Sequence, residues 1–295
     1  MKKIRSAFRV IRPHQWVKNT FVFLPLFFSG DLFDAGKFLV TCAAFFAFSF
    51  AASAVYCLND LVDIEADRSH PKKCTRPLAS GLLSKTFGWT MMVGLCLSSA
   101  LTAYFFGGGD FADVLLVIGI YLLMNIAYSL RLKRIAIIDV FIVSIGFVLR
   151  IAAGSVATQT PLSHWIVLMT FLLSLFMAFA KRRDDVLIFN ASGVKVRKSV
   201  SRLNLSFLNA AIIIVATMTM ICYIMYTVAD EVIERLGSEY LYTTSLFVLL
   251  GILRYLQRIL VDDASGSPTH ILLKDRFIQL TIAGWIASFL FIIYI

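Results

Sequence analysis

The sequence predicts an all-α, polytopic membrane protein with about nine transmembrane helices. Of its 295 residues, 59% are hydrophobic and 16% are charged, whereas soluble domains average about 45–50% apolar and about 25% charged residues. The apolar residues form runs of roughly 18–22 residues along the whole chain, and each run is long enough to cross a hydrocarbon core of ~30 Å as a helix. Since no polar stretch exceeds about 25 residues, which is too few for a separate soluble domain, we expect residues 1–295 to form a single integral-membrane domain.

The apolar runs define nine expected spans, and turn-like breaks at 107–110 and 265–268 interrupt the pattern. In chain order the spans are Gln15–Gly30, Phe38–Leu58, Phe87–Gly107, Val114–Leu130, Ile137–Ala157, Trp165–Ala180, Phe207–Val228, Tyr240–Leu260 and Phe277–Ile295.

The distribution of charged residues orients these spans. If the N-terminus lies in the cytoplasm, nearly all of the 28 Lys and Arg residues fall in cytoplasmic segments, as the positive-inside rule requires. The net charge of +10 therefore reflects topology and a possible affinity for anionic lipid head groups, and it requires no nucleic-acid partner. We expect a protein of the cell inner membrane, with its N-terminus and its active site on the cytoplasmic side.

A dense group of acids follows the second apolar run, in the segment NDLVDIEADR. Asp60, Asp63 and Asp67 are spaced three and four residues apart, which places them on one face of a helix. Adjacent carboxylates repel each other unless a cation lies between them, and Mg²⁺ is commonly held by one or two carboxylates plus substrate phosphates. Asn59 is placed to donate to a phosphate oxygen or to accept from a metal-bound water. The segment therefore predicts a Mg²⁺ site at the membrane edge.

Basic residues follow these acids directly. They are Arg68, His70, Lys72, Lys73 and Arg76. Acids that hold Mg²⁺ beside bases that hold phosphate would form a diphosphate-binding site. The alternative is a solvated cytoplasmic loop whose bases serve only membrane topology, but that interpretation does not explain three helically spaced acids at the membrane edge.

A second charged group, AKRRDDV, follows the expected sixth span. Both acidic groups end even-numbered spans, so both are expected on the cytoplasmic side. If they face each other across a helical cavity, Lys181, Arg182 and an acid, Asp184 or Asp185, would help to hold a diphosphate through Mg²⁺. An ordinary charged helix end explains the same residues equally well.

Five further polar residues lie in or beside apolar spans. Tyr128 and Lys133, in YSLRLKR, either reach the same pocket or anchor the helix at the interface. Lys18 and Asn19 lie deep enough in the first span to need partners. Arg150 lies within the fifth span, where a charge is costly and usually faces a cavity, and either a phosphate or a structural bond to carbonyls would satisfy it.

These segments resemble those of the UbiA-type intramembrane prenyltransferase superfamily. NDLVDIEAD matches its N-D-x-x-D-x-x-x-D motif, RPLASG and YSLRLKR fit as well, and about nine helices around a central cavity are its fold. Within the superfamily, RPHQWVKN, HPKKCTRPLASG, IIDVFIVSIGFVLRIAAG and AKRRDD are similar to segments of the branch that transfers phosphoribose to polyprenyl phosphate. That branch tends toward K-R-x-x-E, where this chain has the shorter acid Asp185 and an added Asp184.

The resemblance implies a transferase domain spanning residues 1–295. It would move phosphoribose from phosphoribosyl diphosphate to a membrane-borne polyprenyl phosphate, with Mg²⁺ as cofactor. The implied residues are, for catalysis, Asp60, Asp63, Asp67 and Lys18; for the metal, Asp60, Asp63, Asp67 and Asp185; and for the substrates, Asn19, Asn59, Arg68, Lys72, Lys73, Arg76, Tyr128, Lys133, Arg150, Lys181 and Arg182. Two alternatives stay open. One is prenyl transfer from an isoprenyl diphosphate to an aromatic acceptor at the same site. The other is a transporter or lipid-binding scaffold without turnover.

Overall fold

The computed structural model describes residues 2–69, 73–107, 111–192, 202–262, 271 and 274–294. Within these ranges the chain is helical and contains no β-strand. It forms two compact units: unit 1 is Met1–Lys133 with Val148–Leu162, and unit 2 is Arg134–Phe147 with Ser163–Ile295. The helix α7 (Ala136–Thr158) contributes its first half to unit 2 and its second half to unit 1.

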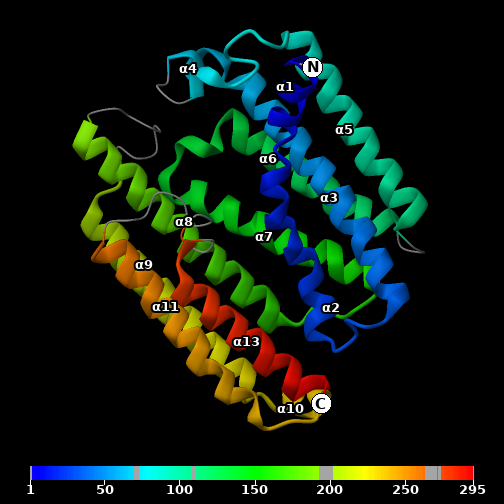
Figure 1. Ribbon diagram of the computed structural model, residues 1–295, viewed down its shortest axis with the longest axis vertical. Helices are drawn as coiled ribbons and strands as arrows, with labels where there is room; N and C mark the ends of the chain where they lie inside the picture. Colours follow the sequence, from blue (N-terminus) through cyan, green and yellow to red (C-terminus); the bar gives the residue numbers. More distant parts are fainter. Residues whose placement is uncertain are drawn as a thin grey trace. The chain divides into compact units, whose positions relative to one another are not determined.

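The remaining elements divide between the two units (Figure 1). Unit 1 holds α1 (Lys2–Ile11), η1 (Pro13–Phe23), α2 (Leu24–Phe28), α3 (Ala35–Val62), α4 (Ile64–Arg68), η2 (Lys73–Thr75), α5 (Lys85–Phe106) and α6 (Phe111–Leu130), and η3 (Leu132–Arg134) lies at its edge. Unit 2 holds α8 (His164–Ser192), α9 (Leu205–Thr227), α10 (Asp230–Leu236), η5 (Tyr240–Thr244), α11 (Ser245–Leu260) and α13 (Arg276–Tyr294).

Eight helical segments among the described residues are long and apolar enough to cross a membrane. They are α3, α5, α6, α7, α8, α9, η5 together with α11, and α13. These segments match eight of the nine expected spans, which confirms the prediction of an all-α, polytopic membrane fold. Most boundaries differ by a few residues, and the largest difference is at α8, which continues to Ser192 instead of ending at Ala180. The second charged group therefore lies inside this helix and not beyond its end.

The segment 15–30, predicted as the first α-helical span, has a different form. It consists of the 3₁₀ helix η1 and the five-residue helix α2. Trp16 Nε1 donates to Ser53 Oγ at 3.0 Å, and the ring centroids of Phe23 and Phe38 lie 5.7 Å apart, so the segment runs antiparallel to α3 (Figure 1). A 3₁₀ helix rises about 2.0 Å per residue against about 1.5 Å in an α-helix, so it covers the same distance with fewer residues.

Close packing against α3 and α7 accounts for this extended form. Asn19 and Val22 on η1 are buried. Asn19 Nδ2 donates to Ser49 Oγ on α3 at 2.9 Å. On the other side, a Cβ atom built on Gly154 of α7 would lie only 1.8 Å from the carbonyl oxygen of Val22. Gly154 therefore lets the backbones of η1 and α7 approach each other as no larger residue would.

The core of unit 1 is built around α3. Its buried face is rich in alanine, with Ala44, Ala47, Ala51 and Ala52 at most 1% exposed. Small residues let helices in a membrane pack closely, and Ser99 Oγ of α5 donates to the carbonyl oxygen of Ala47 at 2.7 Å. The small, apolar residues within 44–52 are thus the surface through which α3, the helix that carries Asp60, packs against its neighbours.

Unit 2 has its own core between α8, α9, α11 and α13. Leu208, Ile212 and Ile259 are fully buried there. Tyr223 of α9 shares a 2.6 Å hydrogen bond with Thr244 Oγ1 and accepts one of 2.6 Å from Trp285 Nε1. Because a buried hydroxyl without partners is costly, this network ties α9, η5 and α13 together at one end of the unit.

We predict that Gly154→Ala lowers the free energy of unfolding by about 1–3 kcal/mol, the usual cost of overpacking. The added methyl group would push η1 away from α7. The matched control is Gly119→Ala in α6, since nothing lies within 4 Å of a Cβ built there. Equilibrium unfolding in mixed micelles measures both variants. Equal stability of the two would show that the η1–α7 approach is not needed.

Candidate functional site

The acids of the first charged group lie where α3 gives way to α4. Helix α3 ends at Val62 and Asp63 is its C-cap, so the three aspartates do not share one continuous helix as predicted. The backbone N–H of Asp63 still donates to the carbonyl oxygen of Asn59 (3.0 Å), and that of Asp67 to the carbonyl oxygen of Asp63 (2.7 Å). Helical spacing therefore persists across the junction.

Two of the three carboxylates meet at one guanidinium group. Arg76 Nη1 donates to Asp60 Oδ1 at 2.9 Å and to Asp67 Oδ2 at 2.6 Å. Asp60 and Asp67 are only 2% and 3% exposed. A buried carboxylate is costly unless it is paired and hydrogen-bonded. Arg76 therefore holds together two acids that would otherwise repel each other.

Arg12, at the junction of α1 and η1, supplies a second cation. Its Nη2 atom donates to Asp60 Oδ1 at 2.5 Å, and its guanidinium carbon lies 5.1 Å from the ring centroid of Tyr56. The backbone of Arg12 adopts the left-handed conformation, with φ of 55°. Arg12 is not among the site residues predicted from the sequence, because its partner lies 48 residues away and only the path of η1 along α3 brings the two side chains together.

The third carboxylate, Asp63, has a different partner. Lys133 Nζ in η3 donates to both of its oxygens, at 2.6 and 2.8 Å. Asn59 Oδ1 accepts a hydrogen bond of 2.6 Å from Ser129 Oγ of α6. These contacts tie the end of α3 to the end of α6. Of the two interpretations of Lys133, these contacts favour a position at the acidic group over a helix anchor at the membrane interface. Within that group Lys133 contacts Asp63.

The other predicted site residues of unit 1 differ in how far they are exposed. Arg68 is exposed, and its Nε donates to the carbonyl oxygen of Ala79 at 3.0 Å. Lys18 on η1, Lys73 on η2 and Tyr128 on α6 are half-buried. Lys72 lies outside the described residues, as does His70.

Arg150 is buried on α7 and points toward η1. Its Nε donates to Asn19 Oδ1 at 2.7 Å, and its guanidinium carbon lies 5.0 and 5.2 Å from the ring centroids of Phe48 and Tyr121. Cation–π contacts of this kind partly compensate a desolvated charge. Of the two interpretations of Arg150, these contacts favour the structural one, because they join α7, η1, α3 and α6.

Unit 2 contains a second buried group of charges. Arg182 Nε forms an ion pair of 2.7 Å with Asp139 Oδ2, and Arg182 Nη1 pairs with Asp185. Asp139, Arg182 and Asp185 are 0%, 2% and 6% exposed. The neighbouring Arg183 donates from Nε to Asn209 Oδ1 at 2.8 Å. Lys181 is exposed on the same helix.

Asp139 was missed as a candidate residue. Its signal was present in the sequence, because an acid inside the apolar run AIIDVFIV is costly unless it is paired. The structure shows that its partner is Arg182, which lies more than forty positions later in the chain, on the next helix, α8. The predicted phosphate ligand Arg182 is therefore also an internal counter-ion of two acids.

The donor set fits Mg²⁺ only in part. No group of three or more His, Cys, Asp or Glu side chains among the described residues is close enough to hold a metal ion. Asp60 and Asp67, however, each place an oxygen against a single cationic nitrogen. Two carboxylates completed by substrate phosphates and water are a common Mg²⁺ site. Asp60 and Asp67 fit such a site, whereas the predicted three-carboxylate set is not assembled here because Asp63 pairs with Lys133.

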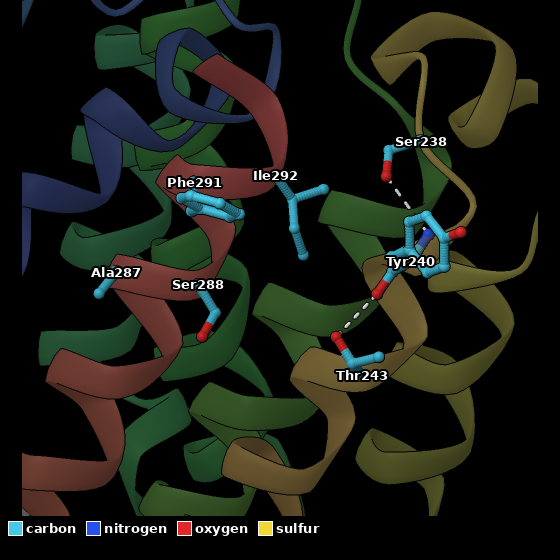
Figure 2. Close-up of a pocket in the computed structure, with 7 residues that line it drawn as sticks. All are labelled: Ser238, Tyr240, Thr243, Ala287, Ser288, Phe291 and Ile292. Carbon is cyan, nitrogen blue, oxygen red and sulfur yellow. Dashed lines mark hydrogen bonds between the residues drawn. The ribbon is translucent and has the colours of Figure 1, made fainter. Parts of the chain in front are cut away.

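Unit 2 also contains a pocket of about 610 Å³ between η5 and the end of α13 (Figure 2). Hydroxyl and apolar side chains line it: Ser238, Tyr240, Thr243, Ala287, Ser288, Phe291 and Ile292. None of these residues carries a charge, and none was predicted from the sequence as a site residue. The pocket therefore lacks the cations that a diphosphate requires.

The fold and these charge clusters define an integral membrane protein with buried acid–base groups in its helices. Residues 20–269 match the model of the UbiA prenyltransferase family, and the chain belongs to this family. It is 35% identical to decaprenyl-phosphate phosphoribosyltransferase of Mycobacterium tuberculosis, over 97% of this chain and 93% of that protein. It is 32% identical to the protein of the same name from Mycolicibacterium smegmatis, over 97% and 91%.

A solved structure shares the fold at low sequence identity. It is a UbiA homolog from Archaeoglobus fulgidus bound to GPP and Mg²⁺, with a TM-score of 0.73, 18% identity, and coverage of 98% of this chain and 100% of that chain. This likeness shows the fold, whereas the family match and the two relatives identify the chain as a transferase of the UbiA superfamily.

We predict that Asp139→Asn lowers the free energy of unfolding by about 1.5–3 kcal/mol, the scale of a hydrogen bond to a charged group, because the variant loses the buried contact to Arg182 while Arg182 keeps Asp185 as a partner. The control is Asp262→Asn, because the Asp262–Arg258 side chains are 35% and 33% exposed and exposed pairs contribute at most about 1 kcal/mol. Equilibrium unfolding in mixed micelles compares the two. A similar small loss in both variants would mean that Arg182 does not depend on Asp139.

Proposed function

We propose that this protein transfers phosphoribose from phosphoribosyl diphosphate to a polyprenyl phosphate, releasing diphosphate, and that residues 1–295 act as one transferase domain. The observation that carries the proposal is the similarity, over 97% of the chain, to proteins named decaprenyl-phosphate phosphoribosyltransferase. Two buried carboxylates paired with Arg side chains, next to the Asp63–Lys133 ion pair, support it.

The chemistry of such a transfer suits these residues. An oxygen of the lipid phosphate forms a bond to the anomeric carbon of the ribose, and the bond from that carbon to the diphosphate oxygen breaks. The attacking phosphate is already an anion, so the reaction needs no strong general base. The remaining requirement is to stabilise the leaving diphosphate, and Arg and Lys side chains provide charge-assisted hydrogen bonds for that purpose.

We assign the metal to Asp60 and Asp67, with Asp63 next to them. When bound there, Mg²⁺ would neutralise charge developing on the diphosphate. Lys18, Lys73, Arg76 and Lys133 remain our candidates for contacts to phosphate oxygens, together with Asn19, Asn59, Arg68, Lys72, Tyr128 and Arg150. We keep Lys181, Arg182 and Asp185 as candidates in unit 2, where Asp185 replaces the Glu that the related branch favours.

The second candidate function is prenyl transfer to an aromatic acceptor. One observation favours it: the Archaeoglobus fulgidus homolog of the same fold is bound to GPP and Mg²⁺. An isoprenyl diphosphate would ionise at the same pair of carboxylates. Both functions need a metal-bound diphosphate, so the carboxylates alone do not distinguish them.

Turnover with paired substrates decides between the two functions. We expect purified protein to convert labelled phosphoribosyl diphosphate and polyprenyl phosphate into a labelled lipid, and to leave isoprenyl diphosphate and an aromatic acid unchanged. EDTA should abolish the reaction and added Mg²⁺ should restore it. Asp60→Asn and Asp67→Asn should each lose most activity. Product from the second substrate pair alone would refute the phosphoribosyl assignment.

The orientation in the membrane is also a proposal. We place the end of α3 in the cytoplasm of a cell whose inner membrane holds the protein, because a soluble sugar diphosphate must reach it. In a background without the five native cysteines, an impermeant thiol reagent added outside should label Glu231→Cys and miss Ser69→Cys. Both positions are exposed. The reverse labelling pattern would invert the topology.

A further inference from the structure

The guanidinium group of Arg76 lies where a metal ion bound by Asp60 and Asp67 would have to lie. One nitrogen atom, Nη1, contacts an oxygen of each carboxylate, at 2.9 and 2.6 Å. The Asp60 and Asp67 oxygens thus converge on a single atom, as two carboxylate ligands converge on a metal ion. Arg76 therefore occupies the position between these two oxygens that a bridging cation would take.

The charges of this group already balance. Asp60 and Asp67 contribute two negative charges, while Arg12 and Arg76 contribute two positive charges. A divalent cation would therefore add two uncompensated positive charges to a buried cluster. Because buried charge without a partner is costly, free metal should bind weakly unless a guanidinium group leaves or an anion enters with the metal.

The side chains of Arg76 and Asp60 differ in exposure. Asp60 is held within α3 and is 2% exposed, whereas the Arg76 side chain is 28% exposed and extends from the turn that follows η2. A long side chain at the edge of the cluster can therefore turn away while the acids stay in place. Its planar fork is well suited to phosphate oxygens.

We propose that Arg76 is an exchangeable counter-ion: it neutralises Asp60 and Asp67 before the metal binds, then yields them to the metal and turns its guanidinium group to the diphosphate of the substrate. Metal and diphosphate would thereby bind together. The inference rests on the metal site of the proposed function, but it does not depend on which diphosphate is the substrate. A purely structural ion pair is the competing explanation.

Metal binding without any substrate tests this exchange. The probe is Mn²⁺, which prefers the same oxygen ligands as Mg²⁺, and the free ion is followed by electron paramagnetic resonance on the full chain in detergent. We expect Arg76→Gln to bind Mn²⁺ at least about fivefold more tightly than the native protein, the lower end of usual coupling between ligands. Radiolabelled diphosphate should bind this variant more weakly than the native protein when both are saturated with Mg²⁺.

Opposite changes in the two affinities support the exchange. A folded Arg76→Gln protein that binds Mn²⁺ equally or less tightly would overturn it, because a structural role lowers metal affinity when the acids lose their support. The matched control is Arg131→Gln, which removes the same charge from an exposed residue directly after α6 that is not among the proposed site residues. Mn²⁺ affinity should not change there.

A second variant guards against misfolding. Arg12→Gln leaves Arg76 in place and removes the contacts of Arg12 to Asp60 and to the Tyr56 ring, so it should tighten Mn²⁺ binding by a smaller factor. If Arg76→Gln does not fold, unchanged or weaker binding in Arg12→Gln overturns the proposal, and tighter binding supports it. Neither measurement uses phosphoribosyl diphosphate. Turnover of isoprenyl diphosphate alone would therefore refute the proposed function and leave this inference standing.

Discussion

The neutralisation of Asp60 and Asp67 is the constraint on which the site in unit 1 depends. Both carboxylates are buried at the junction of α3 and α4, where an isolated charge is not tolerated. Arg12 reaches Asp60 from the N-terminal segment, and Arg76 reaches both acids from the turn after η2. Three separate stretches of the chain therefore have to converge before both buried acids have cationic partners.

The path of η1 follows from the same requirement. Arg12 can contact Asp60 only if the chain before and after it is held against α3. Trp16 and Asn19 bind serine residues of α3, Arg150 binds Asn19, and Gly154 admits the backbone at Val22. The contacts of Arg150 thus support the acidic group at a distance, by fixing the segment that begins at Arg12.

Unit 2 also contains buried carboxylates that need cationic partners, but with a different ratio of acids to bases. There one cation, Arg182, is shared by Asp139 and Asp185. The Arg182 side chain is only 3% exposed, whereas that of Arg76 is 28% exposed. An enclosed guanidinium group has no room to exchange partners, while an edge group does. The two clusters therefore have different physical characters: the first is suited to ligand exchange and the second to holding helices α7 and α8 together.

The sequence by itself determined the class of fold and the position of the acids. Apolar runs long enough to cross a bilayer predict helices almost regardless of context, because every backbone polar group in lipid must be bonded internally, and eight of nine runs became such helices. The spacing of Asp60, Asp63 and Asp67 predicted a shared helical face; Asp60 and Asp67 meet at Arg76, whereas Asp63 pairs with Lys133. Only the tertiary structure decided the rest. It made 13–23 a 3₁₀ helix, joined Asp63 to Lys133, and selected Arg12 and Asp139 as counter-ions. Those outcomes depend on contacts between residues far apart in the chain, and no local pattern encodes which distant charge will meet a buried acid.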